Sequence, residues 1–393
     1  MSSHYVPSLS FGYSLESGLK DIRWYDEDKK EYALNWWEPN SFFQYDWLLT
    51  SVSYIMTSNK AIDFRKRRKI PDSLNLIIDS GGYQEWMKGE VLNPVDIIGI
   101  MDREADIGLI YDKIPYPHTN SPFSVQADHG LFYSSLEVTK KRAEVMIKHR
   151  QNDKNKLYSV LHGYDLPTLK AWYNGLKDLS LDGWCLAVKP ASVYGQALHA
   201  CFMMDQAGRG HGEEHVHVLG VSSVNATPIS AYMSKFFKTV TFDTSTFNRG
   251  CIERGYHLQD DMASRAFFGT NMEAKTLTNS ILPGLPCNCP VCLAVKDADQ
   301  MRANGSIGGL LISLHNLYLF TEFTKRMEIL SKDRALFENY LRRRAPKAYR
   351  TLGMFAEFEK GGMDAVWKYY KTLAREEENG LNLPKEVNLE DVW

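Results

Sequence analysis

The segment Asn75-Leu-Ile-Ile-Asp79-Ser-Gly-Gly-Tyr-Gln84 places an acidic residue at the end of a short apolar run. Two later runs have the same form, Ile107-Gly-Leu-Ile-Tyr-Asp112 and Thr239-Val-Thr-Phe-Asp243. Short runs of β-branched and apolar residues are typical of buried strands. In a parallel barrel the C-terminal strand ends form one rim, where side chains from distant parts of the chain meet. The three aspartates are therefore candidate functional residues of a barrel enzyme.

The apolar runs alternate with helix-like segments between about residues 47 and 250. This alternation favours a parallel sheet with crossover helices. No Gly-x-Gly-x-x-Gly follows an early strand, which counts against a dinucleotide-binding fold. An α/β fold of the (β/α)8 (TIM) barrel type, with an eighth strand still to be located, fits better than an open sheet. We expect strands at 48–55, 75–79, 107–111, 157–161, 184–188, 216–220 and 239–243, and helices near 94–104, 134–150, 167–178, 192–206 and 228–238.

The rhythm of strands and helices ends after Gly250. Residues 280–293 are rich in Pro, Gly and Cys, and 310–350 have the apolar spacing of long helices. These changes suggest four regions. They are an N-terminal extension (1–46), a catalytic TIM barrel (47–279), a zinc-binding subdomain (280–320) and a C-terminal helical region (321–393).

The composition is that of a soluble globular protein, with 393 residues, 44% hydrophobic residues and a formal net charge of −2. Any binding of nucleic acid must therefore rely on local basic runs, for which solvated surface is the more common alternative. No apolar stretch approaches about 18 residues, and the start lacks the features of a secretory signal. We expect a cytoplasmic protein without a membrane partner. The basic runs are Arg65–Lys69, Lys140–Arg142 and Arg342–Arg344.

Three of the six cysteines lie within Cys287-Asn-Cys289-Pro-Val-Cys292. This spacing indicates a metal site rather than a disulfide framework. With His315 as the fourth ligand, the set is Cys3His, a closed tetrahedral composition common for structural Zn²⁺. A second pattern, His211-Gly-Glu-Glu-His215, formally matches an inverted zinc-protease motif that requires a helix. Glycines surround it and a strand follows, so we expect a loop there.

Asp79-Ser-Gly-Gly-Tyr-Gln84, Phe242-Asp-Thr-Ser-Thr246, Cys287-x-Cys289-x-x-Cys292 and Leu314-His-Asn316 occur in this order. Together they resemble the tRNA-guanine transglycosylase superfamily, over about residues 48–320. The resemblance implies exchange of guanine in a polynucleotide for a 7-deazaguanine. Asp243 would be the nucleophile that forms a covalent glycosyl intermediate. Asp79 would be the general acid and base, which requires a raised pKa.

The resemblance also implies how the base is held. Asp112 would accept hydrogen bonds from the guanine edge, Tyr83 would stack on the base, and the Gly81-Gly82 turn would allow a close approach. The target nucleotide would have to leave its stack to reach the acids. The full set of implied substrate-binding residues is Ser80, Gly81, Gly82, Tyr83, Asp112, His162, Ala187, Val188 and Lys189.

The chain departs from the family pattern around this pocket. His162 stands where the family usually has Gln, and Ala187-Val188 stand in place of paired glycines. Lys189 is new and would meet a phosphate, a polar 7-substituent or a carboxylate. Because both catalytic acids remain, we interpret these departures as a changed substrate. The chain looks more like the branch that modifies DNA, with 7-cyano-7-deazaguanine as an example of the incoming base.

Two alternatives remain open at this point. One is an enzyme that acts on tRNA with a divergent pocket. The other is a non-catalytic, nucleic-acid-binding partner subunit, against which the retention of both Asp79 and Asp243 argues. The resemblance further implies a homodimer through the zinc region, and accessory modification proteins are the other class of expected partner.

Overall fold

The computed structural model describes most of the chain. The described residues are 2–9, 23–57, 63–116, 129–187, 193–207, 215–220, 225–244, 247, 255–257, 265–267, 285, 287–297, 300–301 and 306–378.

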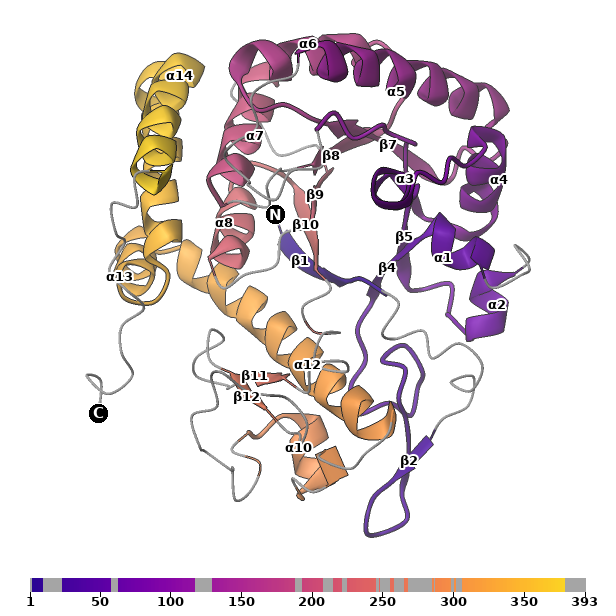
Figure 1. The fold of residues 1–393 in the computed structure, drawn as a ribbon. Coiled ribbons are helices and arrows are strands. Elements are labelled where there is room, and N and C mark those ends of the chain that lie inside the picture. The colour runs from indigo at the N-terminus through magenta and orange to yellow at the C-terminus, as the bar shows by residue number, and fades with distance from the viewer. Residues whose placement is uncertain are drawn as a thin grey trace.

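Eight parallel strands form a nearly closed barrel with helices around it (Figure 1). Seven of the strands are those predicted, and six agree with the prediction within about two residues at each end. The exception is the 48–55 run, which leaves the sheet at Ser51, because a helix starts at Val52. The strands in sheet order are β1 (Ser2–Pro7), β10 (Thr239–Thr244), β9 (His215–Leu219), β8 (Gly183–Ala187), β7 (Lys156–Leu161), β6 (Ile107–Leu109), β5 (Asn75–Asp79) and β4 (Trp47–Ser51).

The eighth strand is β1, from the first residues of the described chain. It pairs in parallel with β10, with Val6 opposite Asp243. At its other edge Ser8 forms a bridge with Leu49, whose carbonyl accepts a hydrogen bond from the Leu9 N–H at 2.8 Å. Residues 2–7 therefore belong to the barrel and not to an N-terminal extension. The 1–46 boundary differs because a strand of six residues carries too little pattern to be placed without its sheet partners.

Helices lie outside the barrel and pack against its strands (Figure 1). Several begin at the expected capping residues, as in α6, where the Asp165 side chain accepts from the Thr168 N–H in a capping box. The helices between the strands are α1 (Val52–Thr57), α2 (Phe64–Arg68), α3 (Gly82–Lys88), α4 (Pro94–Glu104), α5 (His129–His149), α6 (Leu166–Leu176), α7 (Val193–Gln206) and α8 (Ala226–Met233).

The remaining elements flank the barrel. The hairpins are β2 (Arg23–Tyr25) with β3 (Glu31–Ala33) and β11 (Gly255–His257) with β12 (Arg265–Phe267). The long helix α12 (Ser306–Ser331) contacts β1, α8 and β11, and α14 (Pro346–Glu378) lies along α7 (Figure 1). Between or beside them lie α10 (Pro290–Val295) and α13 (Arg334–Arg344). None of the described helices is long and apolar enough to span a membrane.

Candidate active site and metal centre

Asp79 ends β5, and the turn that follows brings the chain close to a second acid. The Gly81 N–H donates to Asp79 Oδ2 at 3.1 Å. Gly81 has φ +91°, a conformation that favours glycine, and a Cβ there would lie 2.6 Å from Ser53 Oγ. A Cβ on Gly82, the first residue of α3, would lie 2.6 Å from Asp112 Oδ1. The two glycines therefore let the start of α3 approach Asp112 closely.

Asp112 is buried just beyond β6 and is paired with a histidine. His162, which follows β7, has its Nε2 2.7 Å from Asp112 Oδ2. Facing a carboxylate, Nε2 is the nitrogen that carries the hydrogen. The ring packs edge-on against Trp172 and Tyr116, at centroid distances of 4.7 and 5.7 Å. Asp112, the predicted guanine-binding acid, is thus in direct contact with His162, the residue that stands where the resembled family usually has Gln.

Asp243 is buried near the end of β10, and one of its oxygens is held from the neighbouring strand. The Gly220 N–H, just past β9, donates to Asp243 Oδ1 at 2.7 Å. His217 Nε2, from inside β9, lies 3.5 Å from the same oxygen. Gly220 has φ +66°, which turns the chain as it leaves β9. Two strand ends thus position this carboxylate.

The three acids influence one another electrostatically. The pKa of Asp79 is raised to about 7, first by burial and then by the negative charges of Asp112 and Asp243. The same three charges contribute, after burial, to raising the pKa of the Cys185 thiol in β8. The structure therefore brings together the acids predicted from three separate strand ends, and gives Asp79 a pKa suited to proton transfer near neutral pH.

The other predicted binding residues differ in burial and position. Ser80 is buried, and its hydroxyl, like His162 Nδ1 and Gln84 Oε1, has no hydrogen-bond partner among the described residues. Buried polar atoms are normally paired, so these atoms are available to a ligand. Tyr83 is 58% exposed, with its ring 5.8 Å from that of Trp86. Ala187 ends β8, and Val188 and Lys189 lie outside the described residues.

Sequence reasoning missed His217, Gly220 and Cys185. The signal for His217 was present, since in Val216-His-Val-Leu it alternates with apolar residues on a buried strand. A histidine within such a strand is more commonly a core residue, and only the neighbouring β10 places it beneath Asp243. Gly220 acts through its backbone N–H, for which no side-chain pattern exists.

The described arginines of the basic runs are partly used within the fold. Arg65 donates to the carbonyls of Glu104, Pro71 and Leu74 and pairs with Asp106 at 2.5 Å. Arg142 forms two hydrogen bonds with the buried Glu85, at 2.9 and 3.1 Å. These runs are therefore not simple basic patches. Other members, such as Lys66, Lys141 and Arg343, are exposed.

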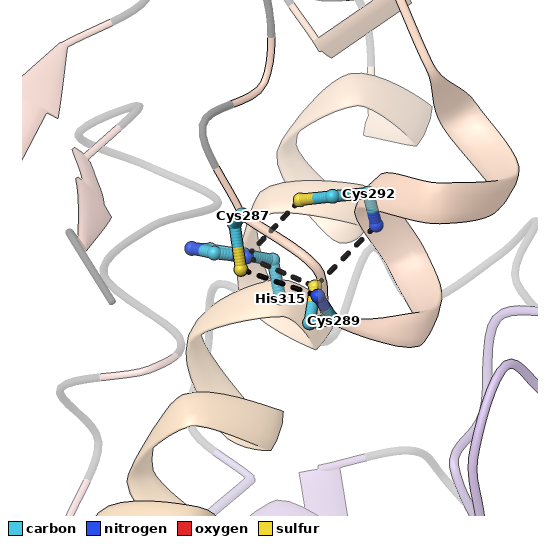
Figure 2. Close-up of side chains that lie close together, drawn as sticks. All are labelled: Cys287, Cys289, Cys292 and His315. Carbon is cyan, nitrogen blue, oxygen red and sulfur yellow. Dashed lines mark hydrogen bonds between the residues drawn. The ribbon is translucent and has the colours of Figure 1, made fainter. Parts of the chain in front are cut away.

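The four predicted metal ligands converge at a second, separate site (Figure 2). Cys287, Cys289, Cys292 and His315 are all buried, and their ligand atoms lie within 4.8 Å of one another. Thiolates bound at about 2.3 Å to a tetrahedral ion lie about 4 Å apart, so the spacing fits such an ion. Cys289 caps α10 by accepting from the Cys292 N–H, while His315 comes from α12.

The neighbours of His315 fix its ring. His315 Nε2 lies 2.9 Å from the His257 carbonyl oxygen and must donate to it, which leaves the Nδ1 lone pair facing Cys289 and Cys292 at 3.3 Å. Tyr256 stacks on the ring with a centroid distance of 3.8 Å, and its hydroxyl lies 3.2 Å from Cys292 Sγ. Hydrogen bonds from Cys289 and Cys292 lower the pKa of the Cys287 thiol. The cluster can hold a metal ion through three thiolates and one imidazole.

The pattern His211-Gly-Glu-Glu-His215 does not offer His215 as a free metal ligand. His215 is the first residue of β9, and both of its ring nitrogens are within 2.8 Å of hydroxyl groups, those of Tyr158 and Thr241. His211 lies outside the described residues. The expectation that this pattern is not on a helix is confirmed at His215.

The chain matches no protein-family model, and no curated protein matches it significantly.

Proposed function

We propose that the protein is a base-exchange glycosyltransferase that replaces guanine in a polynucleotide with a 7-deazaguanine. The observation that carries the proposal is the meeting of Asp79 and Asp243 at one end of the barrel, with the pKa of Asp79 raised to about 7. A nucleophile and an acid with different environments are what a two-step exchange at a sugar carbon needs.

In the first step a carboxylate oxygen of Asp243 forms a bond to the sugar C1′, and the bond from C1′ to the purine nitrogen breaks. The electron pair leaves with the purine, which takes the proton of Asp79. In the second step the incoming base attacks C1′, Asp79 takes its proton, and the bond to Asp243 breaks. Atoms and charges balance over the cycle, and no redox partner is needed.

Recognition of the base rests on the pair of Asp112 and His162. The carboxylate of Asp112 matches the two donors of the guanine edge, and Gly82 lets the chain approach it closely. His162 Nδ1 and Ser80 Oγ supply further buried polar atoms. Tyr83, exposed beside Trp86, offers a flat surface for stacking.

We further propose that DNA is the substrate, on the ground that His162, Ala187, Val188 and Lys189 depart from the tRNA-acting pattern. The metal ion is proposed to be Zn²⁺ in a structural role, because a Cys3His set leaves no position for water. Cytoplasmic location and a homodimer stay predictions.

The test measures incorporation of labelled guanine and labelled 7-cyano-7-deazaguanine into duplex DNA and bulk tRNA, side by side. Asp243→Asn is the control, because an amide cannot form the ester intermediate. Denaturing gels of protein with substrate should show a covalent adduct for the wild type alone.

Label in DNA with an adduct would support the full proposal, and label in tRNA alone would replace DNA by tRNA as the substrate. Label in neither, without an adduct, would contradict catalysis by this chain. That outcome would favour a nucleic-acid-binding partner subunit, and copurification would then identify the catalytic chain.

A further inference from the structure

A continuous column of polar side chains runs inside the barrel below Asp243. Tyr158 Oη lies 2.8 Å from His215 Nδ1, and His215 Nε2 lies 2.8 Å from Thr241 Oγ1. Thr241 Oγ1 also lies 2.9 Å from His217 Nδ1, and His217 Nε2 faces Asp243 Oδ1 at 3.5 Å. The column is built from β7, β9 and β10, and His217 and Thr241 are fully buried.

The carboxylate fixes the direction of every donor in this column. His217 Nε2 has no hydrogen-bond partner among the described residues and faces the Asp243 carboxylate, which can only accept. We therefore place the hydrogen on Nε2, and Nδ1 then accepts from the Thr241 hydroxyl. Thr241 then accepts from His215 Nε2, whose Nδ1 accepts from Tyr158. Burial lowers the pKa of His215 to about 3 and raises that of Tyr158, so both remain neutral links. If every donor in the column were reversed, the lone pair of His217 Nε2 would face the carboxylate, which is unfavourable.

We propose that His217 is a positioning residue for Asp243, and that Oδ2 is the oxygen that attacks the sugar. Oδ1 accepts from the Gly220 N–H at 2.7 Å and faces the His217 Nε2–H. Oδ2 has no hydrogen-bond partner among the described residues, so it can attack without first breaking a hydrogen bond. This inference rests on the proposed function, because it assigns the reacting oxygen of the same nucleophile.

The arrangement suits both steps of the exchange. When Oδ2 forms its bond to C1′, Oδ1 becomes the carbonyl oxygen of the ester, keeps the Gly220 N–H and still faces the His217 Nε2–H. When the ester breaks, the negative charge returns to a carboxylate whose Oδ1 is already facing two N–H groups. No proton has to pass along the column. At 3.5 Å the His217 Nε2–H and Oδ1 are not hydrogen-bonded in this structure, and catalytic contacts of this kind commonly tighten when substrate binds.

Matched substitutions separate this role from packing. In His217→Leu the donor is lost at similar volume, whereas in His217→Gln an amide Nε2 can take the place of the imidazole Nε2. Thr241→Val removes the hydroxyl that donates to His217 Nδ1 and so supports this tautomer, and Thr241→Ser retains it. The measurement is the single-turnover rate of adduct formation on DNA and tRNA, with KM for the polynucleotide and the melting temperature of each variant.

We expect His217→Leu to slow adduct formation by about 100-fold, the usual effect of losing one oriented donor, with KM changed less than about threefold. His217→Gln should recover most of the rate, Thr241→Val should fall between, and Thr241→Ser should match the wild type. A wild-type rate in His217→Leu would overturn the inference. So would equal losses in the Leu and Gln variants at equal melting temperature.

A second measurement does not depend on activity. In protein labelled with ¹⁵N-histidine, the resonances lost in His217→Leu identify this ring among the 11 histidines. We expect a protonated Nε2 and an unprotonated Nδ1, with that preference weakened in Thr241→Val. A ring protonated at Nδ1 alone would overturn the inference even if base exchange is observed. The expected tautomer without base exchange in the wild type would instead contradict the proposed function.

Discussion

At the scale of single residues, the environment of Asp79 sets its chemistry. Burial and the charges of Asp112 and Asp243 raise its folded-state pKa to about 7, against about 4 in an unfolded chain. Between these values the folded protein binds more protons than the unfolded one, so this group lowers the stability progressively as pH rises from about 4 to 7. The acid that we propose for catalysis therefore costs stability at neutral pH.

Asp79→Asn removes this titration. We expect the stability of the variant relative to wild type to increase by about 2 kcal/mol between pH 5.5 and 8, since about 1.5 pH units of the window lie in that interval. Urea denaturation of both proteins at the two pH values measures it, and the pH dependence shared by the metal site cancels in the difference. Asp96→Asn, at an exposed carboxylate in the first turn of α4, controls for loss of charge. A relative stability that does not change with pH would contradict the raised pKa.

At the scale of secondary-structure elements, α3 is held to α5 by a buried ion pair. Glu85 of α3 accepts two hydrogen bonds from Arg142, whose guanidinium lies 4.0 Å from the centre of the Tyr111 ring. Burial opposes the ionisation of Glu85, but the hydrogen bonds from Arg142 and Tyr111 and the nearby positive charges outweigh it and lower its pKa. Because α3 begins directly after the Asp79 turn, this pair also fixes the candidate site.

Arg142→Met leaves Glu85 buried without its main partner. We expect a loss of about 3 kcal/mol at neutral pH, measured by urea denaturation, because an uncompensated buried charge is costly. The loss should shrink as pH falls below about 4, where Glu85 becomes protonated. Arg142→Lys should lie between, since it keeps the charge without the planar fork. The double variant Glu85→Gln/Arg142→Met should be more stable than Arg142→Met alone, and the opposite order would contradict this account.

The strand β1 is anchored through Tyr5. Its ring stacks on Phe320 of α12 at 5.4 Å, and its hydroxyl donates to the Thr244 carbonyl at 3.1 Å. We expect Tyr5→Ala to cost about 4 kcal/mol through the cavity it leaves, and Tyr5→Phe about 1 kcal/mol through the lost hydrogen bond. Tyr25→Ala, at a half-exposed ring in β2, should cost much less in the same denaturation assay. Equal costs for Tyr5 and Tyr25 would contradict a structural role for β1.

At the scale of the whole molecule, the metal cluster joins segments that are far apart in the chain. It connects the Cys287–Cys292 loop with α12, and through the His257 carbonyl with β11, while α12 in turn packs on β1 and α8. A bound ion would therefore stabilise both the flanking segment and its contact with the barrel.

Elemental analysis of the purified protein should find one metal ion per chain, with zinc as the expected element. Cys289→Ser should lose it, and the melting temperature should fall by roughly 5 °C as a few kcal/mol of binding energy disappear. Cys201→Ala, at a buried cysteine in α7 outside the cluster, should retain the metal. Unchanged metal content in Cys289→Ser would show that the ion is bound elsewhere.

The elements with strong local sequence patterns could be predicted before the structure. They include seven strands, the helices near 94–104 and 192–206, the three acids at strand ends and the Cys3His set. These could be predicted because the hydrophobic period, the turn residues and the spacing of metal ligands are local properties of the sequence. Three features became visible only in the folded molecule. They are the strand that completes the barrel, the pairing of Asp112 with His162, and the position of His217 beneath Asp243. These relations join strands separated by long crossovers, and burial and charge at Asp79 exist only once those strands are side by side.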